Sequence, residues 1–155
     1  MNIKIVCFGK LDKKFFIDSF NEYANRISKY ANLQVIELKE EYQKEDVVNK
    51  NINSDLLIDK LKAFSDHEII CMDVSSKNYS TEEFMSIIEN NKNLKQAKIV
   101  FVIGPSDGFS DKFLQQNYKK VSFGNITLPH QLFRIILAEQ IYRAFKIMNN
   151  EKYHK

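Results

Sequence analysis

The stretch AKIVFVIGPSDG, residues 97–108, decides the fold class of this 155-residue chain. Apart from Lys98, its first seven residues are apolar, and Gly104, Pro105 and Gly108 then end the run. A run that is apolar on both alternating faces is typical of a parallel strand, because helices cover both sides of a parallel sheet. We therefore expect a strand at 97–103 in an α/β domain.

The residues before this strand alternate between strand-like and helix-like patterns. Short apolar runs predict strands at 3–8, 33–38 and 68–74, and apolar residues at helical spacing predict helices at 13–30 and 54–64. The charged segment 39–46 predicts a mobile, solvated loop. Ser80-Thr81-Glu82-Glu83 has the spacing of a capping box, so a further helix should begin there.

The residues after the strand complete five strand–helix pairs. We expect a short helix at 111–116, a fifth strand near 120–123, a loop at 124–130 and a long terminal helix at 131–149. The chain contains no internal repeat or linker. Residues 1–155 are thus expected to form a single α/β domain with a largely parallel, five- to six-stranded sheet flanked by helices.

The terminal helix is apolar around most of its circumference. Such a helix must be buried on more than one side, and in a chain of this size its own sheet covers one flank. We therefore predict a homodimer through this C-terminal helix. The alternative is an ordinary core helix whose apolar stripe is wide. The apolar residues are Leu132, Phe133, Ile135, Ile136, Leu137, Ala138, Ile141, Tyr142, Ala144, Phe145, Ile147 and Met148.

Composition excludes several classes of protein. With 44% hydrophobic residues and only 4 Gly and 2 Pro, the chain is globular and neither disordered nor collagen-like. Cys7 and Cys71 lie in apolar strand-like runs, which indicates buried, reduced thiols. The apolar runs are too short to span a membrane and the N-terminus lacks a signal-peptide pattern, so we expect a cytoplasmic protein.

Positive charge is concentrated in the last third of the chain. The net charge is only +3, but residues 104–155 contain eight basic and four acidic side chains. A polyanion is therefore expected to contact this part. Two of the three arginines, Arg134 and Arg143, lie in the terminal helix, where each is either an anion ligand or an ordinary surface charge.

Ligands of open α/β sheets bind beyond the carboxyl ends of the strands. Three loops qualify, at 72–78, 104–108 and 124–130. The sequence contains no dinucleotide-binding, P-loop, serine-hydrolase or metal-ligand motif. His130 and His154 have side chains that exchange protons near neutral pH. For His130 the alternative is a helix cap, and for His154 it is a frayed terminus.

Three segments together resemble the bacterial RlmH family of SPOUT-class methyltransferases. They are the strand at 98–103 running into Gly104, the run VSFGNITLPHQ at 121–131 followed by the helix with EQIYRA at 139–144, and the tail YHK at 153–155. The N-terminal IVCFGK at 5–10 and the chain length also fit, so the resemblance covers essentially the whole chain.

The resemblance implies a fold and an activity. It implies a homodimer whose C-terminal segment, about 98–155, forms a trefoil knot and binds S-adenosylmethionine. It also implies methylation of N3 of a pseudouridine in 23S rRNA on assembled ribosomes, with no metal and no membrane. The knot is implied by the resemblance alone, since threaded connections are almost absent from proteins.

The resemblance also implies residue roles. Adenine can be held by backbone groups between apolar walls, so small and apolar residues suffice for the cofactor. The cofactor residues would be Met72, Gly104, Phe123, Gly124, Asn125, Ile126, Thr127 and Leu128. The candidates for holding rRNA are Arg134, Arg143, Tyr153 and Lys155.

The chain departs from the family pattern at two positions. Pro105 and Ser76 stand where the family usually has glycine. Proline donates no backbone hydrogen bond, so cofactor affinity should suffer if that amide is needed, whereas proline serves if only a tight turn is required.

Proton removal from N3 is the chemical difficulty of the implied reaction. We hypothesise that positioning of the base supplies most of the acceleration, with His130 or His154 assisting proton removal. Two alternatives remain open: a SPOUT methyltransferase that acts on tRNA, and a non-catalytic dimeric RNA- or ribosome-binding protein of the same fold.

Overall fold

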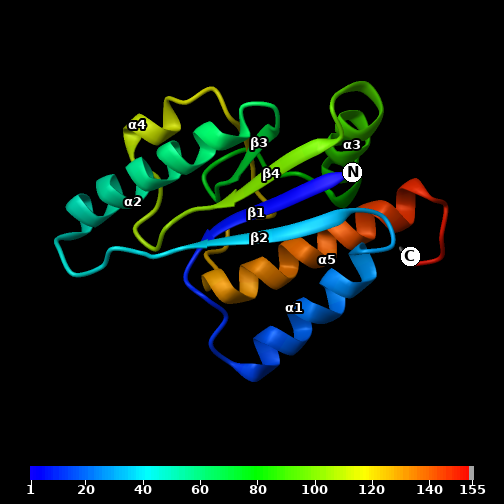
Figure 1. The fold of residues 1–155 in the computed structure, drawn as a ribbon, viewed down its shortest axis with the longest axis horizontal. Coiled ribbons are helices and arrows are strands. Elements are labelled where there is room, and N and C mark those ends of the chain that lie inside the picture. Colours follow the sequence, from blue (N-terminus) through cyan, green and yellow to red (C-terminus); the bar gives the residue numbers. More distant parts are fainter. Residues whose placement is uncertain (154–155) are drawn as a thin grey trace.

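A five-stranded parallel sheet forms the centre of the computed structural model, which describes residues 1–153 (Figure 1). The strand order is β2-β1-β4-β3-β5. Every pair of neighbouring strands is parallel, as the apolar run predicted. The strands are β1 (Asn2–Phe8), β2 (Asn32–Leu38), β3 (Glu68–Met72), β4 (Lys98–Ile103) and β5 (Lys119–Val121).

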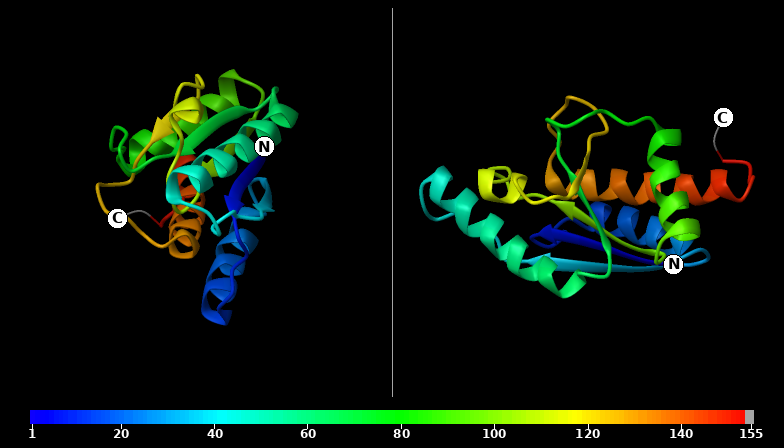
Figure 2. Two further views of the ribbon diagram at one scale, coloured as in Figure 1. Left: turned by 90° about the vertical axis from the view of Figure 1, so that its left-hand side faces the viewer. Right: turned by 90° about the horizontal axis from the view of Figure 1, so that it is seen from above.

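Helices cover both faces of the sheet (Figure 2). One core cluster joins alternate residues of β1 and β4 to α1 (Lys14–Ile27), α3 (Thr81–Leu94) and α5 (His130–Met148). A second cluster joins the other face to α2 (Asp46–Leu61), the 3-10 turn Lys62–Phe64 and α4 (Asp111–Leu114). The central strand β4 is buried on both sides, which explains its unbroken apolar sequence.

Helix α2 begins at Asp46, eight residues before the predicted start at Ser54. Its first half buries Asn49 and Asn53 instead of apolar side chains, so hydrophobic periodicity does not reveal it. Each carboxamide bonds to the preceding loop. The Asn53 side chain pairs with the backbone N and O of Glu41, and the Asn49 side chain with those of Lys44. The charged loop expected to be mobile is therefore anchored to α2.

Helix α5 is covered on more sides by its own chain than the sequence argument assumed. It packs on the sheet and also lies between α1 and α3 (Figure 2). Its buried residues include Leu137, Ala138 and Ile141, whereas Leu132 stays 37% exposed. Of its twelve apolar residues, five are buried, six are half-buried and Leu132 is exposed, so the single chain covers part of the apolar circumference. The predicted dimer stays a prediction.

The capping box predicted at the start of α3 is confirmed. The Ser80 hydroxyl accepts a hydrogen bond from the Glu83 backbone N–H, and the Glu83 carboxylate accepts one from the Ser80 backbone N–H at 2.8 Å. Lys77 pairs with the same carboxylate at 2.9 Å. The Ser80 backbone bond and Lys77 together lower the pKa of Glu83.

We expect Ser80→Ala to lower the free energy of unfolding by about 1 kcal/mol, because one N-terminal amide of α3 loses its acceptor. The measurement is urea unfolding at a fixed protein concentration. Ser86→Ala serves as the control, since the Ser86 hydroxyl only donates back to the Glu82 carbonyl within the same helix. Equal stability of Ser80→Ala and wild type would contradict the assigned role of the cap.

Both cysteines are free and buried, as predicted. Burial raises the pKa of the Cys7 thiol to about 11 and that of Cys71 to about 12. Such thiols stay protonated at neutral pH and are poor nucleophiles. Among the described helices, none is long and apolar enough to cross a membrane.

Candidate functional site

Three loops meet at the carboxyl end of the sheet, as the strand directions predicted. They follow β3, β4 and β5 at 73–80, 104–110 and 122–129. The loops after β3 and β5 are bonded to each other: Asp73 N donates to Val121 O, Tyr79 N to Ser122 O, and Ser122 N to Lys77 O, at 2.9 to 3.1 Å. The trefoil knot implied by the resemblance stays a prediction.

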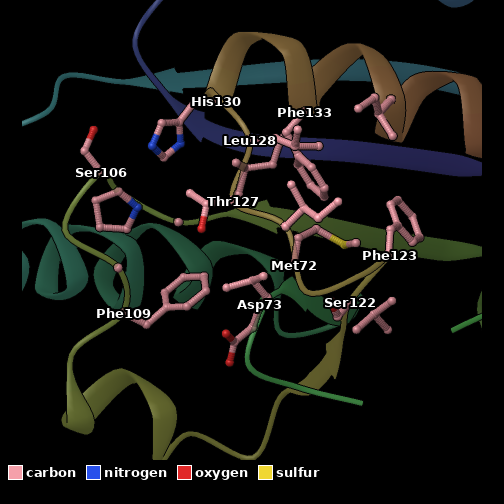
Figure 3. Close-up of a pocket in the computed structure, with 18 of the residues that line it drawn as sticks. Met72, Asp73, Ser106, Phe109, Ser122, Phe123, Thr127, Leu128, His130 and Phe133 are labelled. Carbon is pink, nitrogen blue, oxygen red and sulfur yellow. The ribbon is translucent and has the colours of Figure 1, made fainter. Parts of the chain in front are cut away.

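A pocket of about 580 Å³ lies among these loops (Figure 3). This volume is within the range of small-molecule sites. The pocket also reaches the first two turns of α5 through His130, Phe133 and Ile136. The other residues that line it come from the three strand ends and the loops after them: Met72, Asp73, Val74, Ile103, Gly104, Pro105, Ser106, Asp107, Gly108, Phe109, Val121, Ser122, Phe123, Gly124, Ile126, Thr127 and Leu128.

Aromatic side chains from different elements form part of the wall. The Phe123 ring packs edge-on against buried Phe84 of α3, with centroids 4.9 Å apart, and lies 5.8 Å from the ring of Phe133. Gly124 follows with a φ of 146°, a conformation that favours glycine. The Ser122 hydroxyl bridges the N and O of Gly124, which fixes this turn beside the pocket.

Gly104 allows another wall of the pocket to form. A Cβ at this position would lie 2.8 Å from Cζ of Phe109, so any side chain would displace the ring. Phe109 in turn stacks on buried Phe113, with centroids 4.5 Å apart and ring planes 7° apart. Glycine is therefore required here by close packing, since the φ of Gly104 is not positive.

The two positions that depart from the family pattern are both in tight turns. Gly108 N donates to Pro105 O at 2.9 Å, and the turn is tied to the β2–α2 loop by Ser106 N, which donates to Glu40. Ser76 N and its hydroxyl both donate to Asp73 O. Neither Pro105 nor Ser76 has a positive φ, so both residues adopt these turns without strain.

The pocket is lined by acidic side chains and not by basic ones among residues 1–153. Asp73 and Asp107 line it, and within residues 1–153 no Lys or Arg does. Neither carboxylate forms an ion pair with a described residue. Phosphate-binding sites present cations or clustered backbone N–H groups, whereas this lining is apolar and acidic. The arrangement therefore suits a ligand that is apolar in part and carries positive charge.

A family model described as "Predicted SPOUT methyltransferase" matches residues 1–154. The chain belongs to the SPOUT methyltransferase family.

Relatives of known sequence agree with this assignment over full length. The chain is 57% identical to a protein of Mycoplasma mycoides and 58% identical to one of Mycoplasma capricolum, covering 100% of both chains in each comparison. A protein of Clostridium perfringens is 38% identical over 161 residues. The first two are named "Ribosomal RNA large subunit methyltransferase H", and the third carries the same name with the number 1. The resemblance to the RlmH family is thus confirmed.

A solved structure supports the SPOUT fold. It is titled "The structure of a probable methylase family protein from Haemophilus influenzae Rd KW20" and superposes with a TM-score of 0.53. The match covers 96% of this chain and 66% of that chain, at 11% sequence identity. At this identity the likeness shows the fold alone.

Most of the residues predicted to bind the cofactor line this pocket. Met72, Gly104, Phe123, Gly124, Ile126, Thr127 and Leu128 line it, and Asn125 is exposed and does not. Sequence reasoning did not name Asp73, Phe109, Phe133 or Ile136. Asp73 lies inside the predicted ligand loop 72–78, and Phe109 directly follows the predicted ligand loop 104–108, so their positions in the chain were the available signal. Phe133 and Ile136 were assigned only to the apolar helix.

Arg134 is not a surface residue of this SPOUT domain. It is 1% exposed, and its guanidinium pairs with Glu37 at 2.7 Å and donates to the carbonyls of Phe8 and Gly9. It joins α5 to the carboxyl ends of β1 and β2. This corrects its expected role in holding rRNA, because a buried guanidinium that already binds Glu37 and two backbone carbonyls has no surface to offer a phosphate.

Arg143 and Tyr153 lie together at the far end of α5. Arg143 pairs with Glu139 at 2.6 Å and lies over the Tyr153 ring, 4.7 Å from its centroid. Tyr153 also donates to Glu139, and burial raises its pKa to about 12. Neither residue lines the pocket of its own chain. His154 and Lys155 lie outside the described residues.

Proposed function

We propose that this methyltransferase uses S-adenosylmethionine to methylate N3 of a pseudouridine in 23S rRNA on assembled ribosomes. The observation that carries the proposal is the pocket at the carboxyl end of the sheet. It has apolar walls, a glycine against which an aromatic ring packs, and two acids, and no Lys or Arg of residues 1–153 lines it. The names of the full-length relatives support rRNA as the substrate.

The residues present fit the cofactor. Met72, Phe123, Leu128 and Phe109 offer apolar surface for the adenosine, and the backbone at Gly124 is open to close approach, since no heavy atom beyond its chain neighbours lies within 4 Å of the place a Cβ would occupy. The two carboxylates suit the positive charge of a sulfonium, whereas a nucleotide phosphate would be repelled. When bound, the cofactor supplies an electrophilic methyl group.

The protein's own residues then orient the base and remove a proton. The N3 proton must leave before or during attack on the methyl group. Close positioning of the nucleobase beside the methyl group supplies most of the acceleration. Reactants that are already oriented lose little further translational or rotational freedom on the way to the transition state. His130 lies at the rim of the pocket, at the start of α5, and accepts the proton in this proposal.

A second subunit completes the RNA-binding surface. The proposal retains a homodimer through α5, whose Leu132 is exposed beside half-buried Ile135 and Ile136. No described Lys or Arg lines the pocket, so the groups that hold the rRNA come from Arg143, Tyr153 and the residues after it on the partner subunit. Residues 1–155 form one domain in this proposal, with the knot in about 98–155.

The test uses purified protein, labelled S-adenosylmethionine and ribosomes from cells that lack this methyltransferase, followed by mass spectrometry of the nucleosides. We expect methyl-pseudouridine in 23S rRNA. Methyl transfer to tRNA and not to ribosomes would show that the substrate is tRNA. Absence of transfer, with a control enzyme active on the same ribosomes, would favour the non-catalytic RNA-binding protein.

We expect His130→Ala to lower the methylation rate at saturating cofactor by about tenfold, because positioning supplies the larger part of the acceleration. Cofactor affinity, measured by calorimetry, should change less than the rate. The double variant with His154→Ala tests whether either histidine suffices. Full activity of both single variants and of the double variant would refute proton removal by histidine.

A further inference from the structure

Asp73 is a carboxylate fixed at the end of a core strand. It directly follows β3, and its backbone N–H donates to Val121 O at 2.9 Å. Its Oδ1 accepts hydrogen bonds from the backbone N and the hydroxyl of Ser75, at 3.0 and 2.7 Å. Oδ2 accepts no hydrogen bond from the described residues. The charge is therefore held in one place, and Oδ2 has no hydrogen-bond partner among residues 1–153.

The surroundings of Asp73 strengthen its electric field in the pocket. In the view of Figure 3 the Asp73 side chain is drawn between those of Phe109 and Ser122, which line the same pocket. No described cation pairs with it, and the apolar walls screen charge less than water does. Asp107, the other lining acid, is in the turn between Pro105 and Gly108 at the tip of a loop. Asp73 is thus the acid that the sheet itself positions.

Charge distinguishes the methyl donor from the product of the reaction. S-adenosylmethionine carries a sulfonium, an ammonium and a carboxylate, and after transfer the sulfur of S-adenosylhomocysteine is a neutral thioether. The two molecules otherwise share the adenosine, the ammonium and the carboxylate. A fixed negative charge near the sulfur therefore favours the donor, whereas a negative charge near the ammonium favours both molecules equally.

We infer that Asp73 determines the preference of this pocket for the cationic methyl donor over the neutral product. This inference rests on the proposed function and adds a role that the reaction needs. Because donor and product compete for one pocket, a charge that strengthens only donor binding lets fresh cofactor replace the product after each turnover. Asp73 acts on ligand exchange and does not take part in proton removal.

The test is calorimetric titration of the full-length protein with S-adenosylmethionine and, separately, S-adenosylhomocysteine. Asp73→Asn keeps the shape and the Oδ1 acceptor for Ser75 but removes the charge. We expect it to weaken donor binding about tenfold and to leave product binding within about twofold. The dissociation constant for S-adenosylhomocysteine divided by that for S-adenosylmethionine should therefore fall about tenfold.

Two variants separate this charge effect from other causes. Asp59→Asn removes the same charge from an exposed pair between Asp59 of α2 and Lys62 of the 3-10 turn that follows. Ser75→Ala removes a hydrogen bond from the Asp73 carboxylate but keeps its charge. Neither should move the ratio of the two constants by more than about twofold, because the exposed Asp59 charge is screened and does not line the pocket, and Ser75→Ala leaves the Asp73 charge in place.

Each outcome decides the inference. A lower ratio in Asp73→Asn alone supports it. Equal weakening of both ligands would place Asp73 at the ammonium and overturn it, and so would the same fall in Asp59→Asn. If the wild-type protein binds neither molecule, the proposed cofactor is wrong and the inference falls with it.

Discussion

Replacing Arg134 by methionine is expected to lower the free energy of unfolding by about 3 kcal/mol, because removing one partner of a buried ion pair leaves the other uncompensated. Arg134 is 1% exposed, and its partner Glu37 has a side chain 31% exposed. Methionine has similar length, so the apolar packing of the stem is largely kept. The carbonyls of Phe8 and Gly9 also lose their donor.

Urea unfolding at fixed protein concentration measures this effect, since a dimer makes apparent stability depend on concentration. Arg26→Met is the matched control. Arg26 pairs with Glu22 on the surface of α1, and such pairs contribute about 0 to 1 kcal/mol. The double variant Arg134→Met/Glu37→Met should regain part of the loss because no unpaired charge remains. Wild-type stability in Arg134→Met would contradict the structural role of this arginine.

Gly104→Ala should weaken binding of S-adenosylmethionine by about thirtyfold, because overpacking a well-packed site costs about 1–3 kcal/mol. The new Cβ would lie 2.8 Å from the Phe109 ring, which is stacked on Phe113 and lines the pocket. The ring must therefore move, and the space open to it is the pocket in which we propose that the cofactor binds. Calorimetric titration gives the dissociation constant.

A second substitution tests whether the steric clash is the cause. Gly104→Ala/Phe109→Leu removes the ring edge that the Cβ meets, so it should bind the cofactor more tightly than Gly104→Ala does. Phe109→Leu alone controls for the lost wall. If the double variant binds as weakly as Gly104→Ala, the effect comes from the backbone at Gly104 and not from the ring.

The sequence was informative wherever a local pattern had only one structural solution. The apolar strand β4 is buried on both faces, and the capping box at Ser80 starts α3 at the expected residue. The ligand loops were found for a similar reason, because parallel strands place all their carboxyl ends at one edge of the sheet. No contact between distant residues was needed for these predictions.

The start of α2 and the position of Arg134 could not be read from the sequence. Asn49 and Asn53 look like solvated residues, but their carboxamides are buried because loop backbone groups 5 and 12 residues away bond to them. Arg134 looks like a surface cation on an apolar helix. Its partners, Glu37 and the end of β1, are 97 or more residues away in the chain.

The sequence by itself determined the strand–helix alternation, the parallel sheet and the edge at which a ligand would bind, because hydrophobic spacing and turn residues act over a few positions. The tertiary structure alone decided which side chains share the pocket and which charges are left without partners there. Phe109 reaches Gly104, and Asp73 faces a lining without a described Lys or Arg, only after three loops and α5 have come together. Burial and charge pairing depend on neighbours that are distant in the chain, and folding brings them into contact.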